Sequence, residues 1–229
     1  MNIVIILSGG TGERMKSNCP KQYLLIGKKP VITYTLEIFT KRNDIDKLVI
    51  VADEKWRDFI NKQLQMIDTK QSVNYVSPGT TRQHSIFNAL KMLKENNTAY
   101  DDIVIIHDAV RPLVSKGIID CCIDRCDDHD GVMPVIPIKD TVYHSIDGKQ
   151  IANLLPRSEL FAGQSPESFR FGKYYQIHEE MTFDEISAIN GSSEIAYKKG
   201  LDILLAQGAE SNFKITTLED LKRFELLAQ

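Results

Sequence analysis

Short apolar runs alternate with amphipathic stretches along most of the chain. The apolar runs are residues 3–7, 48–51, 103–106, 132–136 and 203–206. Runs of this length, rich in Ile, Val and Leu, are typical of parallel strands that are buried on both faces of a sheet. The amphipathic stretches, in which apolar residues recur at three- and four-residue spacing, are residues 31–39, 56–66, 81–94, 116–126 and 172–181. That spacing predicts a helix over each of them.

The order of these elements predicts the architecture. Strands that alternate with helices favour a mostly parallel sheet with helices on both faces, which is a three-layer, Rossmann-like α/β fold. Thr217 and Asp220 have the spacing of a capping box, so a last helix is expected there. The chain shows no internal repeat and no linker rich in Pro, Gly or Ser. One domain over residues 1–229 is therefore expected.

One segment, residues 137–166, lacks a long apolar period. It carries polar, strand-compatible pieces at 141–144 and 150–155 on either side of an Asp147-Gly148 turn, which predicts a projecting β-arm. A hairpin of this size is only marginally stable alone, so it is expected to pack against a partner. The simplest partner is a second copy of the chain, and a homodimer is therefore predicted.

Composition and charge exclude several classes of function. Of the 229 residues 42% are hydrophobic and 26% are charged, as in globular proteins, and the net charge is -3. Without a broad basic field, neither nucleic acid nor an anionic membrane is an expected partner, whereas a small anionic ligand needs only a few cations. The first apolar run is too short for a signal peptide or a membrane span, so a cytoplasmic protein is expected. The four cysteines form no C-x-x-C pair, which argues against a metal-thiolate site.

A glycine-rich turn follows the first apolar run. The turn residues are Ser8, Gly9, Gly10, Thr11 and Gly12. Glycines let a backbone approach phosphates closely, and Arg14 and Lys21 add cations at the same place. Met15 stands where a dinucleotide fingerprint needs its third glycine, and no Gly-Lys-Ser/Thr triplet is present, so a dehydrogenase and a P-loop kinase are both disfavoured. A turn that only connects a strand to a helix explains the glycines but not the cations.

A carboxylate follows the central apolar run. Asp108 lies in His-Asp-Ala-Val-Arg-Pro at residues 107–112, directly after the run 103–106. A carboxylate at the end of a central strand is costly to bury unless a cation compensates it, and Mg²⁺ on a nucleotide can do so. The alternatives are a helix N-cap and a salt bridge from Asp108 to Arg111.

Four motifs together resemble one known family. They are Gly-Gly-Thr-Gly-Glu-Arg-Met at residues 9–15, Pro-Lys-Gln at 20–22, His-Asp-Ala-Val-Arg-Pro at 107–112 and Lys-Asp-Thr at 139–141. Over nearly its whole length the chain resembles the family that contains the methylerythritol-phosphate and ribitol-phosphate cytidylyltransferases. The resemblance implies an enzyme, a nucleotidyltransferase that uses CTP and Mg²⁺ to attach CMP to the phosphate of a small polyol and releases pyrophosphate.

The resemblance also implies roles for individual residues. Arg14 and Lys21 would hold the triphosphate and Lys214 the α-phosphate, as the catalytic cations. The implied nucleotide-binding residues, besides the glycine turn, are Gly79, Arg82 and Ser85 in a cytidine-recognising loop at residues 78–85. Asp108 is implied as the Mg²⁺ ligand. Arg111, Thr141 and Arg157 are implied as the acceptor-phosphate site, with Thr141 and Arg157 supplied by the arm of a neighbouring subunit.

Two departures from the family pattern concern the acceptor. Asn190 and Gly191 stand where both branches carry a Thr-Asp pair that faces the acceptor, and Asp184 or Glu194 would have to replace the acidic contact unless both are solvated helix charges. Gly-Gln-Ser-Pro at 163–166 resembles the ribitol branch, and Gly-Gly replaces the usual Ala-Ala of the first turn. A ribitol 5-phosphate-like acceptor is favoured. The alternatives are 2-C-methyl-D-erythritol 4-phosphate, as in isoprenoid synthesis, and a nucleotide-binding regulatory protein without turnover.

Overall fold

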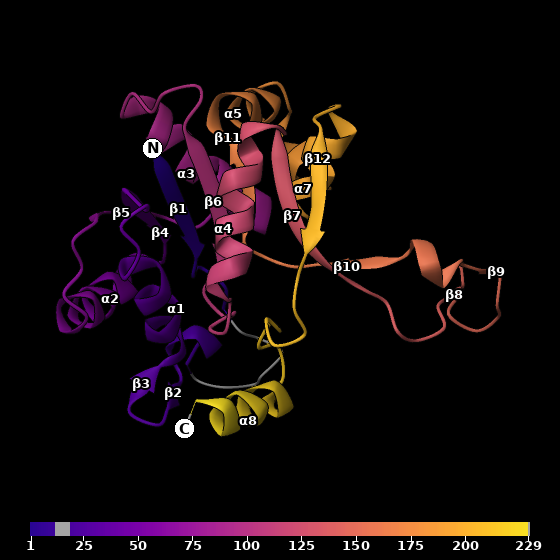
Figure 1. Ribbon diagram of the computed structural model, residues 1–229, viewed down its shortest axis with the longest axis horizontal. Coiled ribbons are helices and arrows are strands. Elements are labelled where there is room, and N and C mark those ends of the chain that lie inside the picture. The colour runs from indigo at the N-terminus through magenta and orange to yellow at the C-terminus, as the bar shows by residue number, and fades with distance from the viewer. Residues whose placement is uncertain (12–18, 229) are drawn as a thin grey trace.

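The five predicted apolar runs all form strands of one sheet. The computed structural model describes residues 1–11 and 19–228. The five strands are β1 (Asn2–Leu7), β4 (Lys47–Val51), β6 (Ile103–Asp108), β7 (Gly131–Pro137) and β12 (Ile203–Gln207). Three further strands that the apolar pattern does not indicate are β5 (Ser72–Val76), β10 (Phe161–Gly163) and β11 (Glu167–Arg170). Within the described residues the sheet has eight strands in the order β10-β7-β11-β6-β1-β4-β5, with β12 along β7 (Figure 1).

The sheet is mostly parallel, as predicted, but β10 and β11 run against the others. β11 lies between β6 and β7 and is antiparallel to both. Between the pairs Gly163–Val135 and Ser168–Val132, the β10–β11 segment advances five residues while β7 advances three. The two extra residues produce a bulge at Gln164–Pro166, immediately beside the carboxyl end of β6. The start of β11 is therefore placed where the parallel strands end.

Helices cover both faces of the sheet. One face carries α1 (Val31–Thr40), α2 (Glu54–Met66) and α4 (Lys116–Asp124), and the other carries α3 (Arg82–Glu95), α5 (Phe171–Glu179) and α7 (Ser192–Lys198). Side chains of a strand alternate between the faces, so Val4 and Ile6 of β1 join the first core while Ile3 and Ile5 join the second. The predicted three-layer α/β fold is confirmed.

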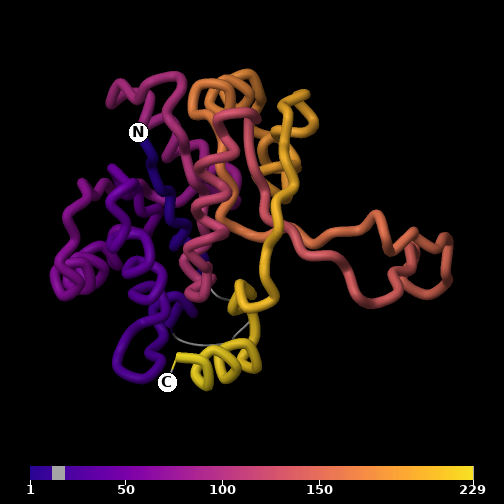
Figure 2. Tube along the Cα trace, viewed as in Figure 1, coloured from indigo at the N-terminus to yellow at the C-terminus, as the bar shows by residue number. Residues whose placement is uncertain are grey.

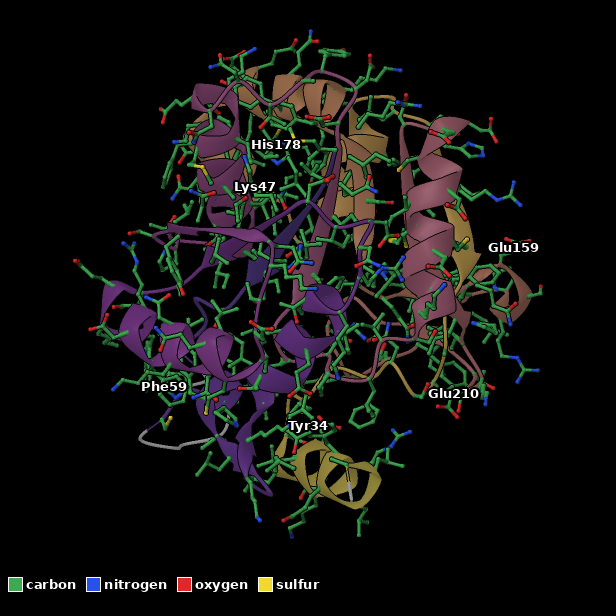
Figure 3. All side chains as sticks on the ribbon, turned by 60° about the vertical axis from the view of Figure 1, so that its left-hand side comes forward. Tyr34, Lys47, Phe59, Glu159, His178 and Glu210 are labelled. Carbon is green, nitrogen blue, oxygen red and sulfur yellow. The ribbon has the colours of Figure 1, made fainter. Side chains whose placement is uncertain are left out.

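The last helix, α8 (Leu218–Leu227), packs below the sheet against α1. It begins with the predicted capping box between Thr217 and Asp220. Phe224 is fully buried and meets the ring of Tyr34 edge to face at 5.0 Å. Figure 3 shows Tyr34 directly beside α8. The remaining short elements are β2 (Leu25–Ile26), β3 (Lys29–Pro30), α6 (Phe183–Ser187) and the 3₁₀ helices Lys21–Tyr23, Arg125–Asp127 and Arg157–Glu159.

The predicted arm extends away from the body as a thin hairpin (Figures 1 and 2). Its tip pairs β8 (Tyr143–His144) with β9 (Asn153–Leu154), and Gly148 has a φ of 70° in the turn between them. Several of its large apolar side chains are exposed, among them Ile146 at 86% and Ile151 at 67%. The hairpin is confirmed, and the second copy that it is expected to contact stays a prediction.

The cysteines behave as core residues. Cys122 and Cys126 are fully buried, and burial raises the pKa of the Cys126 thiol to about 11. Within residues 1–11 and 19–228, no group of three or more His, Cys, Asp or Glu side chains has a metal-binding arrangement. None of the described helices combines the length and apolarity that a membrane span requires.

Candidate active site

A cavity of about 470 Å³ opens at the carboxyl ends of β1, β4 and β6. This edge is where open α/β sheets bind ligands. Its lining comes from six places, namely the end of β1 with the turn that follows it, the 3₁₀ helix Lys21–Tyr23, the end of β4, the loop at the start of α3, the end of β6 with the loop that follows it, and the segment before α8. The lining residues are Leu7, Gly9, Gly10, Thr11, Lys21, Gln22, Val51, Pro78, Gly79, Thr80, Thr81, Arg82, Ser85, Asp108, Val110 and Lys214.

The described part of the glycine turn is held by the buried side chain of Gln22. Its amide nitrogen donates to the carbonyl oxygens of Ser8 at 2.7 Å and Gly10 at 2.8 Å. The Ser8 hydroxyl lies 2.9 Å from that of Tyr23, so it supports the turn from behind. With two carbonyls tied back, the turn is fixed at the wall of the cavity. Two residues predicted to act here, Gly12 and Arg14, lie outside the described residues.

Gly9 is required by the close approach of the glycine turn to the loop at residues 78–85. A Cβ added at Gly9 would lie 2.5 Å from the Cβ of Pro78, whereas one added at Gly10 would meet no atom of the described residues within 4 Å. Gly9→Ala is therefore expected to lower the free energy of unfolding by about 1–3 kcal/mol through overpacking. The matched variant Gly10→Ala should change it by less than about 0.5 kcal/mol. Urea denaturation of both variants checks this, and equal stabilities would contradict the contact.

The loop at residues 78–85 is shaped by its own side chains. The Ser85 hydroxyl accepts from the backbone N–H of Gly79 at 3.0 Å and donates to the carbonyl oxygen of Thr81 at 2.9 Å. The Thr81 hydroxyl caps α3 by accepting from the backbone N–H of His84. An added Cβ at Gly79 would lie 2.4 Å from the Cβ of His84, so only glycine fits there. Ser85 thus lines the cavity and also fixes the loop.

Three cations converge on Asp108, which is 7% exposed. Lys214 Nζ lies 3.0 Å from Asp108 Oδ2, Arg111 Nε lies 3.6 Å from the same oxygen, and Arg82 Nε lies 3.5 Å from Oδ1. Burial alone would raise the pKa of Asp108, but the charges of Arg82, Lys214 and Arg111 outweigh it and hold the pKa well below its ordinary value. The salt-bridge alternative is therefore observed. The N-cap alternative is wrong, because Ser115 caps the next helix.

This cluster suits a ligand with several phosphate charges. Among the cavity-lining residues in the described part of the chain, Asp108 is the one carboxylate, while Lys21, Arg82 and Lys214 are cationic. A single carboxylate fits Mg²⁺ that arrives with phosphate oxygens, because that ion is commonly bound through one or two carboxylates plus a substrate. When such a ligand binds, the cations can give up their contacts with Asp108 and bind phosphate oxygens instead, and their loops need not move.

Behind the cluster lies a layer of polar residues that the sequence motifs did not reveal. The backbone N–H of Asp108 donates to the Ser165 hydroxyl at 3.1 Å. Arg111 Nη1 donates to the carbonyl oxygen of Asn212 at 2.5 Å, and the Asn212 side chain donates to the carbonyl oxygen of Ser165 at 2.8 Å. Gln164 bonds both the N–H and the carbonyl of Ala209, which anchors the segment that leads to Lys214. Through these hydrogen bonds, the bulge between β10 and β11 fixes Asp108, Arg111 and Lys214 relative to one another.

His107 supports the same loop from the core. Its Nε2 lies 3.1 Å from the carbonyl oxygen of Arg111, and its ring meets Phe39 edge to face at 5.0 Å. Burial lowers the pKa of His107 to about 4, against the opposing effect of Asp108. The neutral imidazole therefore donates from Nε2 and braces the Asp108–Arg111 turn.

The arm residues predicted for the acceptor are not brought to the cavity of their own chain. Thr141 and Arg157 are both exposed on the arm, and Arg157 Nη1 donates to the carbonyl oxygen of Lys139 at 2.9 Å. Arg111 is the acceptor candidate that the fold does place beside Asp108. Acceptor binding by Thr141 and Arg157 at the site of another subunit stays a prediction.

The acidic candidates near the missing Thr-Asp pair are engaged elsewhere. Glu194 accepts from the backbone N–H of Asn190 at 2.8 Å and pairs with Lys198 at 2.7 Å. Asp184 is exposed in the first turn of α6. Gly191 caps α7 without a side chain. These contacts are those of solvated helix charges rather than of a ligand site.

Fold and cavity together define an α/β protein with a site for a phosphorylated ligand, because a glycine turn and converging cations meet at the ligand-binding edge of the sheet. The sequence profile of 2-C-methyl-D-erythritol 4-phosphate cytidylyltransferase matches residues 2–229. The chain belongs to this cytidylyltransferase family.

Individual relatives agree with the family profile. A Streptococcus pneumoniae protein named ribitol-5-phosphate cytidylyltransferase is 34% identical over 223 residues, which cover 95% of this chain and 94% of the relative. A protein of the same name from Lacticaseibacillus paracasei is 28% identical over 98% of this chain and 97% of its own. A crystal structure of 4-diphosphocytidyl-2C-methyl-D-erythritol synthase is 26% identical, covers 100% of this chain and 99% of its own, and superposes with a TM-score of 0.80. The chain is thus similar to both branches of the family.

Proposed function

We propose that this cytidylyltransferase transfers CMP from CTP to ribitol 5-phosphate and releases pyrophosphate. The observation that carries the proposal is the convergence of Lys214, Arg111 and Arg82 on Asp108 at the mouth of the nucleotide cavity. The ribitol-5-phosphate name of the 34% identical relative supports this acceptor. CTP occurs in the cytoplasm, so we place the reaction there.

The proposed chemistry needs cations more than it needs a base. An oxygen of the acceptor phosphate attacks the α-phosphorus of CTP, the bond to the β-phosphate breaks in line, and pyrophosphate leaves. The attacking phosphate is already ionised, so no proton has to be removed. Lys214 and Lys21 stabilise the charge on the nucleotide phosphates, and Arg111 holds the acceptor phosphate. Mg²⁺ bound with CTP would be held by Asp108 and would screen the triphosphate.

The acceptor site is proposed to be completed by a second copy of the chain. Thr141 and Arg157 are exposed on an arm that carries exposed apolar side chains, and Arg111 lies beside Asp108 in the body. A homodimer in which the arm covers the partner's cavity would bury these apolar groups and join the two halves of the acceptor site.

A second acceptor, 2-C-methyl-D-erythritol 4-phosphate, is favoured by the family profile and by the solved synthase. Gln164, whose Gly-Gln-Ser-Pro context favours the ribitol branch, bonds to Ala209 and Asn212. It therefore positions the segment before Lys214, and it is not among the described residues that line the cavity. The choice between the two acceptors rests on the relatives.

Pyrophosphate release with CTP, Mg²⁺ and each acceptor in turn tests the proposal. We expect kcat/KM for ribitol 5-phosphate to exceed that for 2-C-methyl-D-erythritol 4-phosphate by about 10-fold or more, a discrimination that a few hydrogen bonds can supply. Lys214→Ala serves as the inactive control. A preference for the methylerythritol phosphate would reverse the acceptor assignment. CTP binding without turnover on any acceptor would favour the regulatory alternative.

A further inference from the structure

Glu167 is a buried carboxylate behind the nucleotide cavity. It is the first residue of β11, pairs with Ile106 of β6 in the sheet register, and is 7% exposed. Its Oε2 accepts from the backbone N–H of Ser193 at 2.9 Å and from the Ser193 hydroxyl at 2.7 Å. Its Oε1 lies 3.4 Å from Nη2 of Arg82. A buried carboxylate with these partners is held in one orientation.

Arg82 is thereby shared between two carboxylates. Its Nε faces Asp108 Oδ1 at 3.5 Å, its Nη2 faces Glu167, and its Nη1 donates to the Ser192 hydroxyl at 2.5 Å. Each nitrogen of the guanidinium thus has a different partner, from β6, β11 and the start of α7. Because the guanidinium is a planar fork, three partners on three sides fix the position of Arg82 and also favour its positive charge.

The charges of the cluster formed by two buried carboxylates and three partly buried cations nearly balance. Arg82, Arg111 and Lys214 contribute three positive charges, and Asp108 and Glu167 contribute two negative ones, which leaves one positive charge. Without Glu167 the balance would be two positive charges, and Arg82 would keep Asp108 as its single charged partner. Glu167 therefore controls both where Arg82 lies and how strongly the cluster attracts anions.

We propose that Glu167 is a positioning residue of the transfer reaction, which acts through Arg82. This inference rests on the proposed function. Glu167 holds the guanidinium of Arg82 at the edge of the cavity. In the ground state the arginine then shifts neither toward Asp108 nor toward the substrate, and in the transition state it meets the phosphates without moving. Interactions that are stronger in the transition state than in the ground state raise kcat, whereas uniform anion binding does not.

Glu167→Gln tests the charge with little change in shape, because the amide oxygen can still accept from Ser193. We expect kcat to fall about 10- to 100-fold while KM for CTP stays the same or falls, since the cluster becomes more positive but less well oriented. Calorimetric titration with CTP in the absence of acceptor should show binding at least as tight as in the wild type. The matched control is Ser193→Ala, which removes one hydrogen bond to Glu167 but retains the charge, and its kcat should stay within about 3-fold of the wild type.

Action through Arg82 predicts coupling between the two positions. In an Arg82→Lys background, Glu167→Gln should lower kcat by clearly less than it does in the wild type, because residues that act as one unit are not additive. If Arg82→Lys and Glu167→Gln instead lower kcat by independent factors that multiply in the double variant, that result would contradict the proposal. So would wild-type kcat in Glu167→Gln, or a raised KM for CTP with kcat unchanged.

A purely structural role gives a different pattern. If Glu167 only anchors α7, then Ser193→Ala, which removes a hydrogen bond of the anchor, should lower the melting temperature and the activity at least as much as Glu167→Gln, whose amide oxygen still accepts from Ser193. Should Glu167→Gln fail to fold, Glu167→Asp keeps the charge and shortens the reach to Arg82, and wild-type kcat in that folded variant would overturn the proposal. Wild-type protein that binds CTP but turns over no acceptor would instead refute the proposed function.

Discussion

Replacing Asp108 with asparagine is expected to reduce kcat for CMP transfer about 10²–10³-fold, as removal of a single electrostatic group from a preorganised site commonly does. The amide keeps the shape of the carboxylate but removes the charge that organises Lys214, Arg111 and Arg82, all within 3.6 Å of it. It also removes the proposed Mg²⁺ ligand. Pyrophosphate release at saturating CTP measures the loss, and circular dichroism checks the fold.

Asp184→Asn is the matched control, because Asp184 is an exposed acid on α6, outside the cavity. Its kcat should equal that of the wild type. The wild-type enzyme should also lose turnover in excess EDTA and regain it with Mg²⁺. Full activity of Asp108→Asn, or indifference of the wild type to EDTA, would refute the assigned role.

The pH dependence of stability gives a separate check on Asp108. Its folded pKa is depressed, so the ionised carboxylate stabilises the fold above the unfolded pKa of about 3.9, and this contribution is lost only as the pH falls through the lower folded value. The difference in unfolding free energy between wild type and Asp108→Asn should therefore be constant from about pH 5 to pH 8. A difference that changes within that range would show that the carboxylate titrates there.

Mixing two inactive variants is expected to restore activity if the acceptor site is shared between subunits. Arg157→Ala disables the arm and Lys214→Ala disables the body, so each homodimer has no working site. A heterodimer has one intact site, made from the body of one chain and the arm of the other. After complete random exchange, half of the dimers are mixed, and activity should reach roughly a quarter of the wild-type value.

Subunit exchange itself has to be shown independently, for example by native mass spectrometry of differently tagged variants. Lys214→Ala mixed with a second body variant, Asp108→Asn, is the control that should recover nothing, because both defects then lie in the same half of the site. If Arg157→Ala and Lys214→Ala also recover nothing despite proven exchange, both residues serve the site of one chain. A monomer in sedimentation experiments would reject the shared site directly.

The sequence was sufficient to predict the elements that have a strong apolar period. Five of the parallel strands, the longer helices on both faces and the capping box of α8 follow from the positions of Ile, Val and Leu and from Thr217 and Asp220. The parallel strand β5 was missed because Ser-Val-Asn-Tyr-Val is not a continuous apolar run. β11 was missed because Glu-Ser-Phe-Arg has neither an apolar run nor a clear alternation. Its place in the centre of the sheet comes from pairing with β6 and β7, which a local pattern does not reveal.

The same limitation applies to the site. Asp108 and the glycine turn follow parallel strands, where ligands are expected, and Lys214 and Arg82 were assigned by family resemblance. Ser165 and Glu167 come before or at the start of a strand, and they reach the site because β11 runs in the opposite direction. Asn212 contributes a backbone carbonyl to Arg111, which no residue type can indicate. Only the fold brings these groups together.

Apart from Gln164 and Ser165, which bond to the residues behind Asp108, the arm joins the body through the short pairing of β10 with β7 and an ion pair between Lys139 and Glu210. Its tip adds no side chain to either main core. Sequence change in the outer part of the arm, residues 140–156, is therefore nearly uncoupled from the packing of the sheet in its own chain. In evolutionary terms the fold separates two parts of the chain: a body that activates the nucleotide, whose sequence is tightly constrained by packing, and an arm whose sequence is free to diversify. Under the proposed shared acceptor site, new acceptors can then be explored by drift in the arm, while the chemistry of phosphate activation is passed on unchanged.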